Sequence, residues 1–213
     1  AGVGLCSRRE AEAWIAEGRV KVNGKKVLTP ALNVSESDAV VVDGKLLQAK
    51  EQTRLWLYHK PAGLVTTHKD PEGRKTVFET LPKTLPRVIS IGRLDLNSEG
   101  LLLLTNDGAL ARKLELPATG WIRRYRVRAY GGITPSMLDG MKNGVTIDGL
   151  NYGSVEAVLD SQKGNNSWLT VSLREGKNRE IRKIFEHIAC TVSRLLRLSY
   201  GHFKLGSLAK GEV

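Results

Sequence analysis

Residues 92–108 read Gly-Arg-Leu-Asp-Leu-Asn-Ser-Glu-Gly-Leu-Leu-Leu-Leu-Thr-Asn-Asp-Gly. An acidic loop between glycines is followed by an unbroken leucine run at 101–104, and residues 106–108 then turn the chain toward leucines at helical spacing. The pattern predicts a loop, a strand buried on both faces, a turn and a helix. A carboxylate on a loop that enters such a strand is held in place while its tip faces a cleft. Asp95 is therefore a candidate nucleophile or general base.

Two other interpretations of Asp95 compete with this one. Asp is a common turn residue, so its side chain could simply cap the loop. A glycosidase would need a second carboxylate, and Glu99 is available four residues later. That pairing is the weaker interpretation, because two carboxylates so close on a loop have no assured separation.

The charge of the chain indicates an anionic partner. Its 213 residues carry a formal net charge of +11. Residues 1–50 hold 8 Lys and Arg against 6 Asp and Glu, a net of +2, which leaves +9 for residues 51–213. Nucleic acid is the commonest partner of such proteins, and the charge lies with the candidate active site. The reacting molecule itself is therefore expected to be polyanionic.

The sequence offers no metal, disulfide or membrane signal. Cys6 and Cys190 share no metal-ligand spacing with each other or with the four histidines, so structural zinc and a disulfide framework are not expected. No apolar run approaches the roughly 20 residues of a membrane span, and no signal-peptide pattern is present. We expect a reducing, cytoplasmic setting and no membrane partner.

Residues 1–49 are expected to form a small RNA-binding unit. Ser7-Arg8-Arg9-Glu10 is a capping box that opens a short helix, and Asn23-Gly24 and Asp43-Gly44 each join two short apolar runs as hairpins. The residues also resemble an S4 RNA-binding domain, notably over 4–12 and 18–25. Basic side chains are candidates to bind RNA phosphates, namely Arg8, Arg9, Arg19 and Lys21. A solvated charged face is the competing interpretation.

After a linker at residues 50–53, residues 54–213 are expected to form a second, α+β domain. Alternation over 123–130 puts Tyr125, Val127 and Ala129 on a core face, and another strand is expected to end at Arg174. Isoleucines and Phe185 then form a helical stripe with Arg182 at its border. Strands dominate with few helical crossovers, which favours a mixed, mainly antiparallel sheet with flanking helices.

Four segments of the second domain, in this order, resemble the RsuA/RluB/RluE/RluF family of ribosomal RNA pseudouridine synthases. They are Lys60-Pro61-x-Gly63, Gly92-Arg93-Leu94-Asp95 with Glu99 to Leu103, Arg124 to Val127, and Glu175 to Arg182. Together with the S4-like domain they span nearly the whole chain. Residues 70–74 and 192–201 are closest to the members of the family that act on large-subunit RNA.

The resemblance implies an enzyme that detaches a uridine base at N1, rotates it and rejoins it through C5, without cofactor or metal. It assigns Asp95 as the nucleophile, which attacks either the ribose C1′ or the uracil C6. Tyr125 is expected to stack on the flipped base, and Arg182 is the candidate cation that keeps Asp95 ionised. One of Leu195, Leu196 and Leu198 is expected to line the pocket.

Further basic and polar residues are candidates to bind RNA around this site. Lys60 and Arg93 flank the catalytic motifs, and alternate arginines on one face of a strand lie about 7 Å apart, close to the spacing of backbone phosphates. The complete set expected in the second domain is Lys60, Arg93, Arg124, Arg126, Lys177, Asn178 and Arg179.

The expected substrate is ribosomal RNA, 23S before 16S, either free or within an assembly particle, and the protein is expected to be a monomer. A loop or bulge uridine is favoured, because a paired base costs a few kcal/mol more to extrude. The alternatives are a 16S rRNA pseudouridine synthase and a non-catalytic ribosome-assembly protein built on an S4-like domain. The second alternative explains the charge but not residues 92–108.

Overall fold

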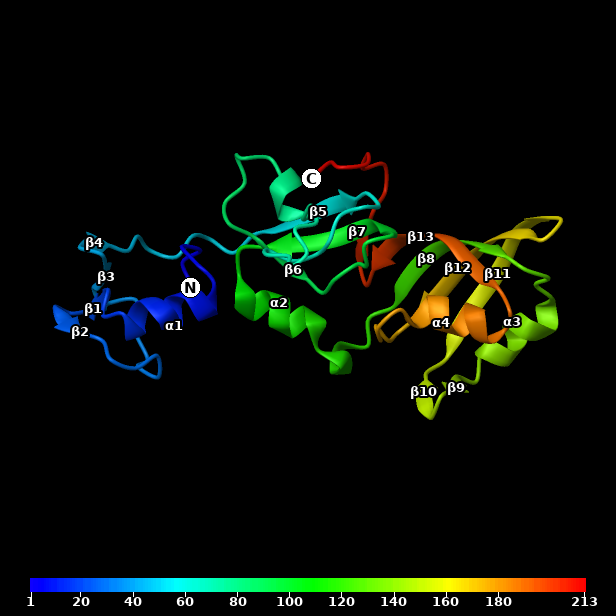
Figure 1. The fold of residues 1–213 in the computed structure, drawn as a ribbon, viewed down its shortest axis with the longest axis horizontal. Helices are drawn as coiled ribbons and strands as arrows, with labels where there is room; N and C mark the ends of the chain where they lie inside the picture. Colours follow the sequence, from blue (N-terminus) through cyan, green and yellow to red (C-terminus); the bar gives the residue numbers. More distant parts are fainter.

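The computed structural model describes residues 1–213. Figure 1 shows the first unit at one end of the long axis, β5, β7 and α2 in the middle, and α3 and α4 toward the other end, with the C-terminus back in the middle. The first unit holds one helix and a four-stranded sheet in the order β2-β1-β3-β4. Its elements are α1 (Arg8–Ala16), β1 (Val20–Val22), β2 (Lys25–Lys26), β3 (Val40–Val42) and β4 (Lys45–Leu46). These four strands pair only with one another.

Local sequence signals determine this first unit as predicted. The Ser7 hydroxyl accepts from the Glu10 amide at 3.2 Å, and the Glu10 carboxylate accepts from the Ser7 amide at 2.7 Å, so the capping box is confirmed. Asn23 and Asp43 both have φ of 49°, and the glycine after each has φ of 78°. Two successive positive φ angles are what a type I′ hairpin turn requires, which confirms both hairpins.

An eight-stranded sheet organises the rest of the chain, in the order β11-β12-β8-β13-β7-β5, with β14 beside β13 and β6 beside β7. Only β13 and β7 run parallel, so the predicted mixed, mainly antiparallel sheet and the α+β class are confirmed. The strands are β5 (Leu55–Lys60), β6 (Ile89–Ile91), β7 (Ser98–Thr105), β8 (Arg123–Tyr130), β11 (Val155–Lys163), β12 (Asn166–Leu173), β13 (Thr191–Tyr200) and β14 (Phe203–Lys204).

Helices and one small hairpin flank this sheet. They are η1 (Phe78–Thr80), α2 (Gly108–Glu115), η2 (Pro117–Thr119), α3 (Pro135–Met141), the hairpin of β9 (Val145–Ile147) and β10 (Leu150–Tyr152), and α4 (Glu180–His187). The sequence reasoning did not identify β6, η2, α3, β9, β10, β11, β13 or β14 as helices or strands. Most of these are short, and the longer β11 and β13 carry no clear apolar alternation along their whole length. None of the helices combines the length and the apolar character needed to cross a bilayer.

The leucine run is buried on both faces of the sheet, as predicted. Leu101, Leu102, Leu103 and Leu104 are all 0% exposed. Leu102 and Leu104 pack in one apolar cluster with Tyr58, whereas Leu101 and Leu103 pack in another with Ala111 of α2. Burial of both faces fixes β7 at the centre of its half of the sheet, and with it the loop that precedes it.

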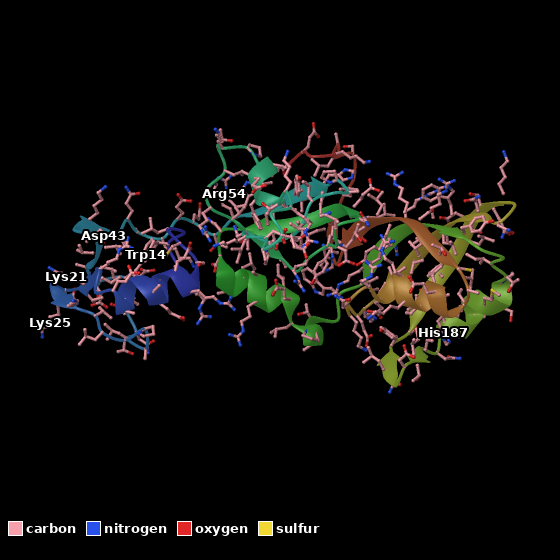
Figure 2. The ribbon with its side chains drawn as sticks, in the orientation of Figure 1. Trp14, Lys21, Lys25, Asp43, Arg54 and His187 are labelled. Atoms are coloured by element: carbon pink, nitrogen blue, oxygen red, sulfur yellow. The ribbon has the colours of Figure 1, made fainter.

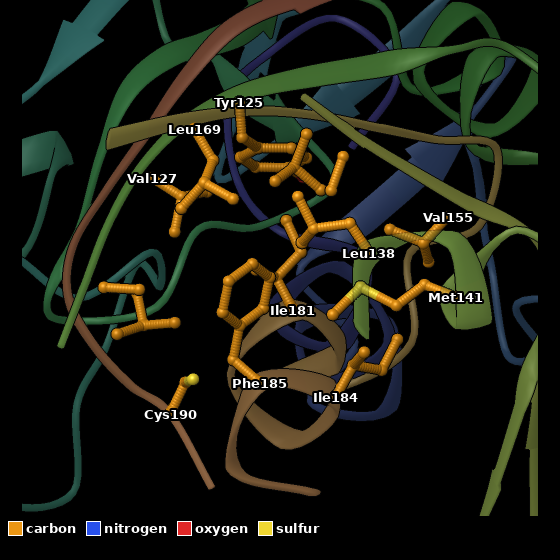
Figure 3. Close-up of a cluster of buried hydrophobic side chains, with 14 of the residues drawn as sticks. Tyr125, Val127, Leu138, Met141, Val155, Leu169, Ile181, Ile184, Phe185 and Cys190 are labelled. Carbon is orange, nitrogen blue, oxygen red and sulfur yellow. The ribbon is translucent and has the colours of Figure 1, made fainter. Parts of the chain in front are cut away.

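The other half of the sheet packs against α4 and α3. Val127 and Leu169 from neighbouring strands lie in one apolar cluster with Ile184 and Phe185 of α4 and Leu138 of α3, and Figure 3 shows these side chains together. The alternation predicted for residues 123–130 is confirmed, because its odd-numbered residues point toward this core. The β8 strand therefore presents one face to α4 and the other to solvent.

The two halves meet where β7 and β13 run parallel. Gly100 lies opposite Arg197 in this register. Its φ is +100°, and an added Cβ would overlap the Arg197 carbonyl oxygen and lie 2.7 Å from the Arg197 amide nitrogen. Only glycine permits so close an approach of the two backbones.

Residues 50–53, the expected linker, hold no helix or strand. Lys50 Nζ lies 3.0 Å from the Asp107 carboxylate, and the Thr53 hydroxyl donates to it at 2.7 Å. These bonds lower the pKa of Asp107, whose carboxylate also accepts from the Ala109 amide at the start of α2. The segment is thereby attached to the N-terminus of α2.

Candidate active site

A cleft of about 620 Å³ opens beside the parallel junction of the sheet. The loop of residues 92–97 borders it from one half of the sheet, and the loop of residues 174–179 borders it from the other. Asp95, Tyr125 and Leu195 all line this cleft, so the structure brings together residues that are up to 100 positions apart in sequence. The candidate side chains come from both halves of the sheet.

Asp95 is oriented by its neighbours rather than by bonds to its own carboxylate. Leu94 is buried in the core, and its carbonyl accepts from the Thr66 hydroxyl at 2.8 Å. The Asp95 carboxylate forms no hydrogen bond within the protein. The interpretation of Asp95 as a side-chain turn cap is therefore wrong, and its oxygens are available to a molecule in the cleft.

Lys60 holds the Asp95 loop from behind. Its ammonium is completely buried and lies 3.0 Å from the Asp95 carbonyl, 2.8 Å from that of Ser98, 3.0 Å from that of Pro61 and 3.3 Å from that of Leu96. Burial lowers its pKa to about 8, and the charge of Asp95 opposes that shift. The prediction that Lys60 binds RNA is wrong, because the ammonium cannot reach solvent and the loop carbonyls already surround it.

Arg182 supports the same loop from α4. It is 9% exposed, and its guanidinium donates to the Asn97 carbonyl at 3.3 Å and to the Val192 carbonyl of β13 at 3.1 Å. Burial and Arg179 lower its pKa, whereas the negative charge of Asp95 acts in the opposite direction. Arg182 thus lies within electrostatic reach of Asp95 but forms no ion pair with it within 4.0 Å.

Tyr125 and Leu195 supply the apolar wall of the cleft. Tyr125 is 8% exposed on the inner face of β8, and Leu195 is 7% exposed on the neighbouring strand β13. Leu196 lies on the other side of β13, in the cluster beneath α2. Among the three leucines left open by the sequence, Leu195 is the one that faces the cleft.

The loop before α4 presents two free polar side chains. Asn178 and Arg179 are exposed at the cleft rim and have no side-chain partner in the protein. Lys177 is instead bonded to the Glu175 carboxylate at 2.8 Å and to the Asn151 carbonyl at 2.6 Å. Of the three residues expected here to bind RNA, Lys177 is already committed to protein contacts.

Glu180 fixes the shape of this loop. It is 3% exposed, and one of its carboxylate oxygens accepts from the Lys177 amide at 2.9 Å. The other oxygen is buried without a partner. Burial raises the pKa of Glu180 to about 7, and the nearby charge of Glu175 adds to this shift.

The predicted arginine track lies on the wrong side of the sheet for the cleft. Arg124 and Arg126 are exposed on the face of β8 opposite Tyr125. Arg126 lies 3.9 Å from Asp160 and over the Trp168 ring. Because residues alternate between faces, these two arginines cannot contact RNA inside the cleft. Arg93, in contrast, is exposed and lines the cleft.

The basic residues of the first unit differ in their availability. Arg8, Arg9 and Lys21 are exposed and pair with no carboxylate, and Figure 2 shows Lys21 at the end of the molecule farthest from α4. Arg19 is bonded to Asp43 at 2.6 Å and to Glu17 at 3.2 Å, which raises its pKa. The Arg19 guanidinium is therefore neutralised within the protein and does not fit the expected role in RNA binding.

Three cleft residues were missed by the sequence reasoning, namely Arg123, Arg197 and Tyr200. Arg197 is 3% exposed on the same side of β13 as Leu195, two positions away. Residues two apart on a strand share a face, so the position of Arg197 could have been predicted from that of Leu195. Arg123 lies two residues before Tyr125 and on the same face of β8.

The glycosidase interpretation finds no support in the position of Glu99. Its carboxylate accepts from Arg194 at 2.8 Å and lies 2.8 Å from Lys210 Nζ, and these bonds lower its pKa although burial opposes them. Glu99 does not line the cleft. No group of three or more His, Cys, Asp or Glu side chains is arranged to hold a metal ion.

Comparisons with known proteins agree with this two-part organisation. Residues 3–48 match the S4 domain, and residues 54–187 match the family described as RNA pseudouridylate synthase. An RNA pseudouridine synthase of Rickettsia felis, named as uncharacterised, is 54% identical over 98% of this chain and 90% of its own length. Ribosomal large subunit pseudouridine synthase B of Pasteurella multocida is 42% identical over 99% of this chain and 63% of its own length.

The fold is also similar to that of a solved protein. The crystal structure of a pseudouridylate synthase superposes with a TM-score of 0.69 at 25% identity, and the match covers 99% of this chain and 90% of that chain. The similarity therefore extends over both parts of the molecule.

Proposed function

The chain belongs to the RNA pseudouridylate synthase family and carries an N-terminal S4 domain, and we propose that it converts one uridine of 23S rRNA to pseudouridine. The choice of 23S rRNA is supported by relatives named ribosomal large subunit pseudouridine synthase B, which are 42–43% identical. These relatives are longer, and the chain spans 53–63% of their length. The observation that carries the proposal is the unbonded carboxylate of Asp95 in the cleft beside Tyr125.

Asp95 is the proposed nucleophile. The N1–C1′ bond of the target uridine breaks, the base rotates, and a C5–C1′ bond forms, after which C5 loses its proton and N1 carries one. A carboxylate supports this sequence by attacking C1′ or C6 and leaving again, and it needs no cofactor. Its oxygens meet that requirement because no protein group occupies them.

Tyr125 and Leu195 are proposed to hold the flipped base. A uridine must leave its stack to reach Asp95, which costs a few kcal/mol. Stacking on an aromatic ring regains roughly 1–3 kcal/mol per base. Since both side chains lie on the inner face of adjacent strands, they form a fixed apolar surface against which the base packs.

Lys60 and Arg182 are proposed to hold the Asp95 loop in place and to put two positive charges near its carboxylate. Lys60 binds the carbonyls of the loop on its buried side, and Arg182 binds Asn97 two residues beyond Asp95. Arg93, Asn178 and Arg179 at the rim, with Arg8, Arg9 and Lys21 of the S4 domain, are the proposed contacts to the RNA backbone.

The direct test is to incubate the purified protein with protein-free large-subunit and small-subunit rRNA transcripts, then to map pseudouridine by carbodiimide labelling and reverse-transcription stops. We expect one new stop in the large-subunit RNA. Asp95→Asn is expected to abolish the stop and to change RNA binding by no more than a few-fold. Asp148→Asn, in the exposed β9–β10 turn, is the matched control and is expected to keep full activity.

Three results would contradict parts of the proposal. A stop only in the small-subunit RNA would replace 23S by 16S rRNA as the substrate. Activity in a well-folded Asp95→Asn protein would remove Asp95 as the nucleophile. No stop in either RNA, and none in precursor ribosomal particles, would contradict the proposed reaction on rRNA.

A further inference from the structure

Arg197 is a buried cation that the proposed reaction does not use. Its Nε donates to the Leu101 carbonyl at 2.7 Å, but neither terminal nitrogen of the guanidinium has a partner in the protein, and no carboxylate lies within 4.0 Å. A guanidinium carries five N–H donors, and buried polar groups are normally satisfied. At 3% exposure on the wall of the cleft, Arg197 holds donors that the protein itself leaves unused.

A second arginine lies beside it. The guanidinium carbons of Arg123 and Arg197 lie 4.8 Å and 5.2 Å from the centre of the Tyr200 ring. Arg123 donates to the Arg174 carbonyl at 2.6 Å and to the Tyr200 hydroxyl at 3.3 Å, and it pairs with no carboxylate. The Tyr200 hydroxyl donates to the Leu114 carbonyl at 2.9 Å, which fixes the ring between these elements.

The acidic groups of the cleft do not neutralise these two cations. Glu115 accepts from the Gly92 amide at 2.6 Å, and Glu175 is bonded to Lys177 and to the Gly153 amide. A cation–π contact contributes only about 0.5–2 kcal/mol and leaves the positive charge in place. Two like charges gathered at one ring therefore repel each other until an anion joins them.

We propose that Arg123 and Arg197 form a subsite for one phosphodiester group next to the target uridine. The inference rests on the proposed function, because the cleft must first receive RNA. The planar guanidinium is suited to bidentate binding of phosphate oxygens. The protein supplies the donors, and the RNA backbone supplies the missing anion.

The position of the subsite fits the proposed place of the base. Arg197 is the cross-strand partner of Tyr125, and Arg123 lies two residues before Tyr125 on the same face of β8. Residues two apart on a strand are about 7 Å apart, a span comparable to that from base to phosphate within one nucleotide. A uridine stacked on Tyr125 thus places a flanking phosphate at the two arginines.

The first test measures binding rather than activity. In the Asp95→Asn protein, the affinity for a large-subunit rRNA transcript is measured over a series of salt concentrations. Arg123→Gln and Arg197→Gln are each expected to reduce the slope of log affinity against log salt by about 1, the loss of one phosphate contact. Lys163→Gln, at the exposed tip of the β11–β12 hairpin, removes one charge elsewhere and is expected to leave the slope unchanged.

Because Arg197 is buried, the folding of the Arg197→Gln protein is first checked by a thermal melt. If that variant unfolds, the test uses Arg123→Gln, because Arg123 is half-exposed. Unchanged slopes in RNA-binding variants would overturn the subsite and leave the proposed reaction intact. A parent protein that binds RNA but converts no uridine would contradict the proposed reaction. The salt dependence of RNA binding would still show whether Arg123 and Arg197 bind a phosphate.

The second test locates the phosphate. Short RNAs that contain the mapped uridine are made with an uncharged methylphosphonate at its 5′ or its 3′ phosphodiester. We expect one of the two to raise KM several-fold with little change in kcat, and we expect Arg123→Gln to show no further loss with that RNA. Independent losses at both positions would overturn the proposal and would favour a uracil carbonyl as the acceptor for these arginines.

Discussion

At the scale of single residues, Asp95 and Lys60 both stand in the motifs that resemble the family, but the structure gives them different tasks. The Asp95 carboxylate lies unbonded in the cleft, whereas the Lys60 ammonium donates to carbonyls on the buried side of the Asp95 loop. The Asp95 and Leu96 carbonyls also accept from the Ser98 and Gly63 amides, and the ammonium adds a further bond to each of them and to the Ser98 carbonyl. The orientation of Asp95 therefore depends on a side chain that RNA cannot touch.

Replacing Lys60 tests this dependence. Lys60→Met keeps the length of the side chain but removes the ammonium from four carbonyls, of which those of Asp95 and Leu96 still accept from the Ser98 and Gly63 amides. The lost bonds cost roughly 1–3 kcal/mol of unfolding free energy. We expect a lower midpoint in urea and a large loss of turnover from the native fraction. Lys83→Ala, on an exposed loop, should change neither quantity. A fully stable and active Lys60→Met protein would show that the Asp95 loop keeps its conformation without the Lys60 ammonium.

Glu180 makes a pH-dependent prediction. Its pKa in the folded protein is about 7, above its ordinary value of 4.5, so the folded state favours the protonated carboxyl. The unfolded chain releases this proton first as pH rises, and the parent protein therefore loses stability from about pH 4.5 to pH 7. Glu180→Gln keeps the acceptor for the Lys177 amide and cannot ionise.

The expected result is a Glu180→Gln protein that matches the parent near pH 4.5 and is more stable at pH 8, by on the order of 2 kcal/mol. Urea unfolding at the two pH values measures this difference. Glu12→Gln, at an exposed position of α1, serves as the control and should show the same difference at both pH values. A stability gain for Glu180→Gln that does not change with pH would contradict the raised pKa.

At the scale of elements, the cleft exists because two antiparallel halves of a sheet are joined by one parallel pair, β7 and β13. The loops before β7 and before α4 then meet at that junction. Gly100 permits the junction, since its positive φ and missing Cβ let the backbone of β7 approach Arg197. On its other side, β13 pairs with β8, which places Arg197 beside Tyr125.

Gly100→Ala should therefore disrupt more than a local turn. The added Cβ overlaps backbone atoms that cannot rotate away, and alanine also adopts this φ at a cost of about 1–3 kcal/mol. We expect a loss of stability of roughly 3 kcal/mol or more, measured by thermal or urea unfolding. Gly149→Ala, at a positive φ of 76° with open space around it, isolates the backbone cost and should be destabilised less. Equal losses in the two variants would contradict the close approach.

Elements with strong periodicity were predictable from sequence, and the pairing between them was not. The leucines of β7, the alternation of β8 and the apolar stripe of α4 each fixed one element correctly. Whether Arg124 and Arg126 lie on the same side of the sheet as Asp95 depends on which strands pair. No local sequence pattern encodes this pairing. Lys60 was misassigned for a similar reason, because a lysine beside a turn resembles a surface residue until the fold closes over it.

At the scale of the whole molecule, the two parts have separate cores. Every member of the three apolar clusters of the sheet lies after residue 54. The four strands of the first unit pair only among themselves. The basic residues proposed to bind RNA are correspondingly divided between the S4 domain and the rim of the cleft, and an RNA that contacts both parts would gain affinity from their connection.

A shortened protein beginning at Lys50 tests this division. It retains the Lys50 contact to Asp107 and all three clusters, so we expect its melting temperature to stay within a few degrees of that of the parent domain. Its affinity for rRNA should fall, and the salt slope should fall with it, because Arg8, Arg9 and Lys21 are lost. Unaltered RNA affinity would indicate that the S4 domain does not contribute to substrate binding.

The buried ammonium of Lys60 also affects how this enzyme would be studied genetically. A survey of variants scored only by lost modification would rank Lys60 beside Asp95 and would suggest a chemical role for both. Scoring the cellular abundance of each variant in parallel separates them, because Asp95 variants remain abundant while Lys60 variants are depleted. Inactive positions would then divide into those that meet the RNA and those that maintain the shape of the loop.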